Sequence, residues 1–291
     1  MAAFSRRWRA ATPELAMEAA AAHAVRDFAR FPPIDPVSVA ERFGAVVAVR
    51  PGASDDGPRT AAHHGRLTVR DDRWFIETPV RLNAERRRFS IAHEVGHILL
   101  FDSVAQNPAL IRELRSAAVW KRVERLCNIG AAHLLMPTAT FRAALDTALP
   151  PTQERVEALA LQFRVSLAAA ARRIPEVHPD WSLIVWQYDT THRRGAAWRT
   201  TVASQTAGQQ FLPEGLSSGR LTPDVVEEAA GAGSATSRSV LADVPGVSRM
   251  EDVTAWLARG SRPELVEFED LRQRDRVFLF YRSAPPTAQE A

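Results

Sequence analysis

The stretch FSIAHEVGHILLF, residues 89–101, places two histidines and a glutamate inside an otherwise apolar run. His93 and His97 are four residues apart, so on a helix both imidazoles lie on one face, one turn apart. Two imidazoles at this spacing can bind one divalent ion. Glu94 points aside from that face, where it can take a proton from a water on the metal. The spacing predicts a metal site; a purely structural pair of histidines is the alternative.

A catalytic zinc needs a third protein ligand and one open position. The best source is KRVERLCNIGAAHLLMP, residues 121–137. Glu124 and Asn128 are four residues apart and share a helix face, so Glu124 can bind the metal while Asn128 orients a histidine ligand. His133 is nine residues after Glu124, about 180° further round a helix with 3.6 residues per turn. We therefore expect His133 to point away from the metal.

The stretches RRRFSIAHEVGH and ERLCNIGAAHLLMP resemble those of the ImmA/IrrE family of metallopeptidases. Members usually show an RxRFTxAHExGH-like stretch followed by ExxxNxxAAELLMP. The resemblance covers residues 35–137 and departs at His133, where the family often has Glu. It implies Zn²⁺ as the cofactor, with His93, His97 and Glu124 as ligands and Glu94 as general base. It also implies the substrate, a helix-turn-helix transcriptional repressor whose cleavage derepresses a stress, DNA-damage or antiphage defence operon.

With 291 residues, 46% of them hydrophobic, the chain is long enough for two domains. In the first part we expect a helix capped by Thr12, a short helix ending near Gly44 and a strand at 45–50. A hairpin at 65–78 follows, and then helices through HEVGH and over about 113–135. The predicted fold class is α+β, in which residues 1–140 form a mainly helical, zincin-like metallopeptidase domain with a small sheet.

Residues 141–178 are predicted to be a helix-turn-helix-like helical segment, with two short helices over 152–174 joined near Arg164–Ser166. A DNA-reading helix normally offers several polar side chains near its start. The second helix here is mostly alanine, and only Arg172 and Arg173 are expected to be exposed. The pattern therefore favours packing against the peptidase domain over DNA reading.

Residues 179–291 are expected to form an α/β regulatory domain, and the whole layout resembles the radiation-response branch of the family, which implies a GAF-like sensor. We expect a hairpin at 181–204, helices near 223–230 and 249–260, and strands at 264–271 and 275–283, the last one central in its sheet. Arginines and aromatics gather in this part, a combination that can bind single-stranded DNA as an activating signal. Core aromatics with solvated arginines, or a small-molecule pocket, are the alternatives. The residues concerned are Arg193, Arg194, Arg199, Arg272, Arg274, Arg276, Arg282, Trp181, Trp186, Trp198, Phe278, Phe280 and Tyr281.

The chain has one cysteine, Cys127, so an internal disulfide is excluded and a cytoplasmic location is expected. Cys127 lies three residues after Glu124 and could approach the zinc as a switch; a buried structural cysteine is the alternative. No run of 18 apolar residues occurs, so we expect no membrane partner. The net charge of +3 is too small to indicate nucleic-acid binding.

Two further functions are compatible with the sequence. The chain could be a non-catalytic regulator that binds DNA or the repressor around a structural metal, although Glu94 is needed only for chemistry. It could also be a toxin-like peptidase with another cytoplasmic target. The oxyanion-stabilising residue and the oligomeric state have no signal in the sequence.

Overall fold

The computed structural model describes residues 1–29, 32–50, 65–104, 117–146, 151–178, 181–189, 197–204, 265–273 and 276–283. The chain divides into two compact units. The first consists of Met1–Ala144 with Leu159–Ala169, and the second of Leu145–Ala158 with Ala170–Ala291. The boundaries that we expected at 140/141 and 178/179 stay predictions.

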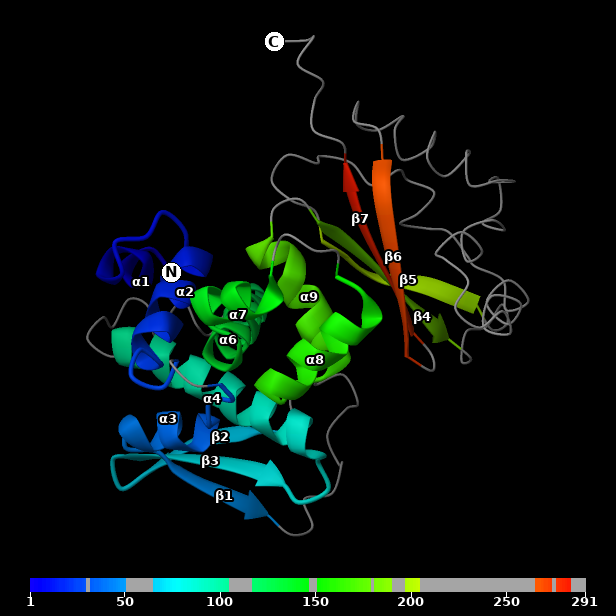
Figure 1. The fold of residues 1–291 in the computed structure, drawn as a ribbon. Coiled ribbons are helices and arrows are strands. Elements are labelled where there is room, and N and C mark those ends of the chain that lie inside the picture. Colours follow the sequence, from blue (N-terminus) through cyan, green and yellow to red (C-terminus); the bar gives the residue numbers. More distant parts are fainter. Residues whose placement is uncertain are drawn as a thin grey trace. The chain divides into compact units, whose positions relative to one another are not determined.

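The first unit is mainly helical with a small sheet, as the fold class predicted (Figure 1). Long helix α4 lies between the sheet and the helices α2 and α6, and it contacts both layers. The described elements of the first unit are α1 (Ala2–Arg7), α2 (Pro13–Ala24), α3 (Pro36–Arg42), β1 (Val46–Arg50), β2 (Arg66–Arg70), β3 (Arg73–Pro79), α4 (Ala84–Val104), α6 (Ala117–Leu135) and α7 (Thr138–Leu145).

The described strands of this unit form a sheet in the order β1-β3-β2. β1 is parallel to β3, whereas β2 and β3 are antiparallel neighbours joined at Asp71 and Asp72. Both aspartates have positive φ, 49° and 57°. Two successive positive φ values are the mark of a type I′ turn, whose twist suits a two-residue hairpin. The predicted hairpin is therefore confirmed, and β2 lies at an edge of the described sheet.

The helix starts follow local hydrogen bonding. Thr12 caps α2, because its side chain accepts a hydrogen bond from the Leu15 amide at 3.2 Å, with Pro13 in the first turn as predicted. Asp35 caps α3 by accepting from the amides of Val37 and Ser38. The short helix α1 was not predicted, and the described part of α6 begins at Ala117.

Arginines at the start of α4 attach this helix to its neighbours. Arg88 donates to the carbonyl of Ile34 at 2.7 Å and to that of Arg164 at 3.2 Å. Burial lowers the pKa of Arg88 from its ordinary value. Arg87 donates to the carbonyls of Val80 and Leu82. The RRRF part of the motif therefore holds the α4 start in place, upstream of the two histidines.

The predicted pair of short helices at 152–174 is confirmed as α8 (Gln153–Phe163) and α9 (Leu167–Val177). The expectation that Arg173 is exposed was wrong. Its side chain is 2% exposed and pairs with Glu176, whereas Arg172 is exposed as expected. Because most of α9 is buried, it offers few side chains for reading DNA.

The described strands of the second unit form an antiparallel sheet in the order β5-β4-β7-β6. β7 lies between two other strands, which confirms its predicted central position. The GAF-like assignment stays a prediction, and the helices expected at 223–230 and 249–260 lie outside the described residues. The strands are β4 (Ser182–Asp189), β5 (Ala197–Ser204), β6 (Leu265–Gln273) and β7 (Arg276–Ser283).

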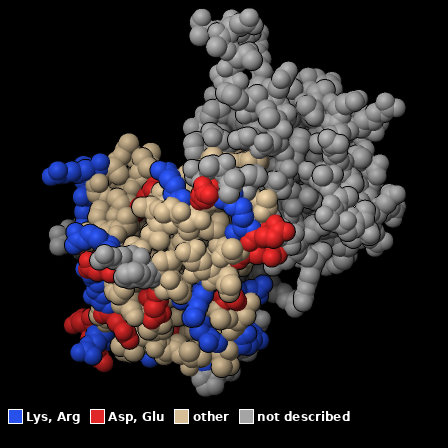
Figure 2. All heavy atoms as spheres, in the orientation of Figure 1, with Lys and Arg blue, Asp and Glu red and all other residues tan. Residues whose placement is uncertain are grey.

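The face drawn in Figure 2 mixes charges of both signs. Figure 2 shows Lys and Arg interspersed with Asp and Glu over the described part of the face in view. A nucleic-acid site usually gathers basic side chains into a patch or stripe, which this view does not show. Within the described part of the chain, no helix is both long and apolar enough to cross a lipid bilayer.

Candidate metal centre

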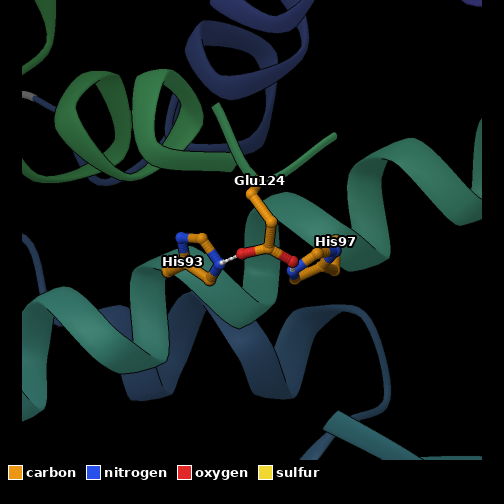
Figure 3. Close-up of side chains that lie close together, drawn as sticks. All are labelled: His93, His97 and Glu124. Carbon is orange, nitrogen blue, oxygen red and sulfur yellow. Dashed lines mark ion pairs between the residues drawn. The ribbon is translucent and has the colours of Figure 1, made fainter. Parts of the chain in front are cut away.

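His93, His97 and Glu124 come together where α6 crosses α4 (Figure 3). The carboxylate of Glu124 lies between the two imidazoles. Its Oε2 is 3.2 Å from Nε2 of His93 and its Oε1 is 3.4 Å from Nε2 of His97. One ligand atom from each residue lies within 4.8 Å of the other two. The structure thus brings together the three ligands that the sequence predicted.

These distances fit a metal ion. Zinc bonds to imidazole nitrogen and carboxylate oxygen at about 2.0–2.2 Å, so neighbouring ligands of a tetrahedral site are about 3.3 Å apart. The two nitrogen–oxygen distances, 3.2 and 3.4 Å, have this size. Two imidazoles and one carboxylate are also the ligand set of catalytic zinc sites that keep a fourth position open. The residues therefore fit a divalent metal.

Asn128 lies beside His93, where the sequence predicted it. Its Oδ1 lies 3.0 Å from Nδ1 of His93. A carbonyl oxygen only accepts hydrogen bonds, so Nδ1 of His93 carries the proton and its Nε2 presents a lone pair to the ligand cluster. Asn128 is one turn after Glu124 on α6, so a single helix face supplies both a metal ligand and the group that orients another.

Replacing Asn128 with Ala is expected to weaken metal binding about 10- to 100-fold, because the His93 ring loses its orienting hydrogen bond. Zinc affinity can be measured by competition with a chromophoric chelator. Asn128→Asp retains an oxygen acceptor and should recover most of the affinity. Equal affinity in the wild-type and Asn128→Ala proteins would contradict the orienting role.

A close helix crossing places α6 over α4. A Cβ added to Gly96 would lie 3.0 Å from Cα and 3.1 Å from the carbonyl oxygen of Cys127. Real Cβ atoms rarely come this close to backbone, so only glycine allows the two helices to approach as they do. Gly96 is therefore a close-packed position of this crossing. Since Cys127 is three residues after Glu124, this crossing sets the distance of Glu124 from the histidines.

Gly96→Ala and Gly130→Ala form a matched pair of helix-interior substitutions. Each gains about 1 kcal/mol of helix propensity. At Gly96 the added methyl meets backbone, and overpacking of this kind costs about 1–3 kcal/mol. At Gly130 it meets Sδ of Met17 at 2.9 Å, the far end of a flexible side chain. We expect Gly96→Ala to lower both the melting temperature and the zinc affinity, and Gly130→Ala to change both little. A larger loss of melting temperature and zinc affinity in Gly130→Ala than in Gly96→Ala would contradict the role of Gly96 in the helix crossing.

Glu94 is buried beside the start of β2. A Cβ on Gly65 would lie 2.8 Å from Oε1 of Glu94, so the bare backbone at Gly65 leaves room for this carboxylate. Glu94 lines the same cleft as the ligand cluster without being one of its members. This is the placement that the sequence predicted for a general base.

The cluster opens into a cleft of about 640 Å³ between β2, β3, α4 and α6. Sequence reasoning missed much of its lining. The signal existed for two residues: Phe101 is four residues after His97, and Trp120 is four residues before Glu124, so each shares a helix face with a ligand. The missed residues are Gly65, Arg66, Leu67, Thr68, Val69, Trp74, Phe101, Trp120 and Lys121.

Cys127 and His133 are not members of the ligand cluster. Cys127 is buried against Gly96, and burial, helped by the carboxylates of Glu124 and Glu94, raises the pKa of its thiol well above the ordinary value. A thiol in this state is a poor metal ligand, and the switch stays a prediction. Nδ1 of His133 lies 3.6 Å from Oε1 of Glu18. The expectation that His133 points away from the metal is confirmed.

Comparison with known proteins agrees with this geometry. The family described as "Peptidase_M78: IrrE N-terminal-like domain" matches residues 40–175. The radiation response metalloprotease IrrE of Deinococcus deserti is 32% identical over 187 residues, 62% of this chain and 62% of that protein. Residues 40–175 therefore form an IrrE N-terminal-like domain of the ImmA/IrrE family. The Deinococcus radiodurans radiation response metalloprotease IrrE, another family member, is 32% identical over 99 residues, 33% of this chain and 29% of that protein.

The alignments cover less than two thirds of either Deinococcus protein. Among solved structures, a Mycobacterium tuberculosis transcriptional regulator matches 92% of this chain and 75% of its own with a TM-score of 0.52. The two sequences are 16% identical, so this likeness concerns the fold alone.

Proposed function

We propose that the chain is a zinc-dependent, site-specific endopeptidase of the HExxH class, in which His93, His97 and Glu124 hold zinc and Glu94 is the general base. The observation that supports this best is the position of the Glu124 carboxylate, which α6 places between two α4 imidazoles at ligand spacing. Zinc suits the two-nitrogen, one-oxygen ligand set. Glu94 in the same cleft gives the site a group for proton transfer, which a purely structural metal does not need.

The residues divide the chemistry between them. A zinc ion held there would polarise the scissile carbonyl and lower the pKa of a water ligand. Glu94 accepts the proton that the water loses and passes it to the leaving amine. Its burial beside Gly65 restricts the carboxylate to the cleft. Asn128 keeps the His93 ring oriented through Nδ1.

The substrate that we propose is a helix-turn-helix transcriptional repressor, cut in the cytoplasm so that a stress, DNA-damage or antiphage defence operon is derepressed. Support comes from family membership and from the two Deinococcus relatives, which are named radiation response metalloproteases. The cleft has one wall formed by β2, an edge strand of the described sheet. Such an edge can receive an extended peptide segment of a protein substrate.

The activating signal that we propose is single-stranded DNA, bound by a GAF-like sensor domain at 179–291. Arginines and aromatics are frequent in this part of the sequence, and together they suit phosphate contact and base stacking. Trp181 is 1% exposed and is therefore a core residue rather than a stacking one. A small-molecule ligand of the same domain is the competing signal.

The alternative is a non-catalytic regulator that binds DNA or the repressor around a structural metal. The fold is shared with a protein titled a transcriptional regulator, but at 16% identity this likeness carries no function over to the chain. Two observations speak against the alternative. α9 buries most of its side chains, including Arg173, and Glu94 lines the cleft next to the ligand cluster.

The test is a cleavage assay with the repressor encoded beside the gene. The zinc-loaded protein is incubated with this repressor alone, with a single-stranded oligonucleotide, and with the duplex of the same sequence; a chelator arm and a zinc add-back arm complete it. We expect one cut, only with single-stranded DNA, that the chelator abolishes and zinc restores. A cut without DNA would contradict the proposed signal. No cut in any arm by stoichiometrically zinc-loaded protein would contradict the combination of the repressor as substrate and single-stranded DNA as signal.

A further inference from the structure

Three aromatic side chains form a row beside the ligand cluster; we name Trp74, Phe101 and Trp120 the aromatic wall. Phe101 stacks on His97 with ring centroids 5.6 Å apart and an interplanar angle of 22°. Trp120 stacks on the same imidazole at 5.7 Å and 16°. Trp74 of β3 stacks on Phe101 at 6.2 Å and 16°. The wall therefore runs from a metal ligand on α4 outward to the sheet.

The wall faces the cleft. All three of its side chains line the cleft, and Leu67 and Val69 of β2 continue the apolar lining. Trp120 is 43% exposed and Val69 is 56% exposed. Exposed apolar side chains that are scattered singly are ordinary, whereas those gathered in a concave site mark a place where an apolar group binds.

Positioning of His97 does not account for the whole wall. Nδ1 of His97 has no hydrogen-bond partner among the described residues, so the stacked rings of Phe101 and Trp120 do hold this imidazole. Trp74, however, has its described ring contact with Phe101 and not with His97. It lines the cleft, and the exposed part of Trp120 is likewise not used by His97. These surfaces are available to a ligand.

We propose that the aromatic wall is a subsite that binds a large apolar side chain of the substrate next to the bond that is cut. This rests on the proposed peptidase function and specifies its substrate. The subsite is continuous with the ligand cluster, so its occupant lies within about one residue of the scissile bond. The basic side chains in the cleft are Arg66 and Lys121, the latter being the only lysine of the chain. They disfavour lysine or arginine in the occupant's place.

The first test measures binding without cleavage. Phenylalanine hydroxamate and alanine hydroxamate carry the same metal-binding group and differ only in the side chain. Their affinities for the zinc-loaded protein are compared by calorimetry. We expect phenylalanine hydroxamate to bind about tenfold more tightly or better. Trp74→Ala and Trp120→Ala should remove most of this preference, whereas Trp120→Phe should retain it.

The controls separate a subsite from a structural role. Zinc content is measured for every variant, and Trp74→Ala must keep its zinc, because the Trp74 ring stacks on Phe101 and not on a member of the ligand cluster. Leu161→Ala removes an apolar side chain that is 79% exposed on α8 and outside the cleft lining, so it should change neither affinity. Equal binding of the two hydroxamates by the wild-type protein would overturn the proposal.

The second test concerns the cut itself. A library of proteome-derived peptides is digested with the zinc-loaded wild-type protein in the presence of the single-stranded oligonucleotide, and the cut sites are read by mass spectrometry. We expect Leu, Met, Phe, Tyr or Trp to dominate one substrate position flanking the cut. Trp74→Ala should reduce this preference for large apolar residues. Cuts with no apolar preference would contradict the subsite while leaving a peptidase. Side-chain-dependent hydroxamate binding with no cut peptide would retain the subsite and count against the peptidase.

Discussion

Glu94→Gln is expected to slow peptide cleavage by about 10²–10⁴-fold while zinc content and zinc affinity stay at wild-type values. The substitution keeps the shape of the side chain and removes its ability to accept a proton. Glu94 lines the cleft without belonging to the ligand cluster, so zinc binding should not change. Most of the loss should appear in kcat, because the proton transfer occurs in the transition state.

The measurement pairs single-turnover cleavage with metal analysis of the same sample. Glu85→Gln is the matched control, since Glu85 is exposed in the first turn of the same helix and outside the cleft lining. It should cleave at the wild-type rate. If Glu94→Gln cleaves as fast as the wild type, Glu94 is not the general base.

The ligand set could be predicted because helix geometry determines it. His93 and His97 share a helix face by spacing alone, and Glu124 with Asn128 does so on the next helix. The resemblance to the family motif then predicted that the residues of the two helices form one metal site. The residues of the motif that carry no chemistry proved to be structural: Gly96 allows the helices to approach, and Arg88 attaches the start of α4.

The cleft could be predicted less well, because it depends on how the sheet packs on α4. The hairpin was predicted, but its side of α4 and the parallel pairing of β1 with β3 arise from contacts far apart in the sequence. Local sequence patterns therefore do not predict that Gly65 and Trp74 line the cleft. Trp120 could have been found, since the rule that paired Glu124 with Asn128 also pairs Trp120 with Glu124.

Arg173 shows the limit of reading exposure from a helix pattern. On α9 the pattern of small residues indicated two exposed arginines, yet Arg173 is buried and pairs with Glu176. A long side chain can lie within the protein when an acidic neighbour three residues away offsets its charge. The hydrophobic period predicts which face is apolar, and it contains no information on such pairs.

Glu124→Gln is expected to weaken zinc binding by more than about 100-fold, in contrast to the same isosteric change at Glu94. Loss of a group that only orients a ligand already costs about 10- to 100-fold in affinity, and Glu124 is placed as a ligand itself. Its two oxygens lie 3.2 and 3.4 Å from the nitrogens of His93 and His97. An amide in their place has one weaker oxygen donor and no charge to offset that of the metal.

The two glutamine variants together separate metal binding from proton transfer. At limiting zinc, Glu124→Gln should be metal-free and inactive, and raising the zinc concentration should restore part of its cleavage by mass action. Glu94→Gln should be fully loaded at the same zinc concentration and stay inactive when more is added. Wild-type zinc affinity in Glu124→Gln would remove Glu124 from the ligand set. Both changes delete one negative charge from the same cleft, so a general electrostatic effect would give the two variants the same zinc affinity and the same cleavage rate. Distinct roles require that Glu124→Gln loses zinc affinity and that Glu94→Gln loses only cleavage.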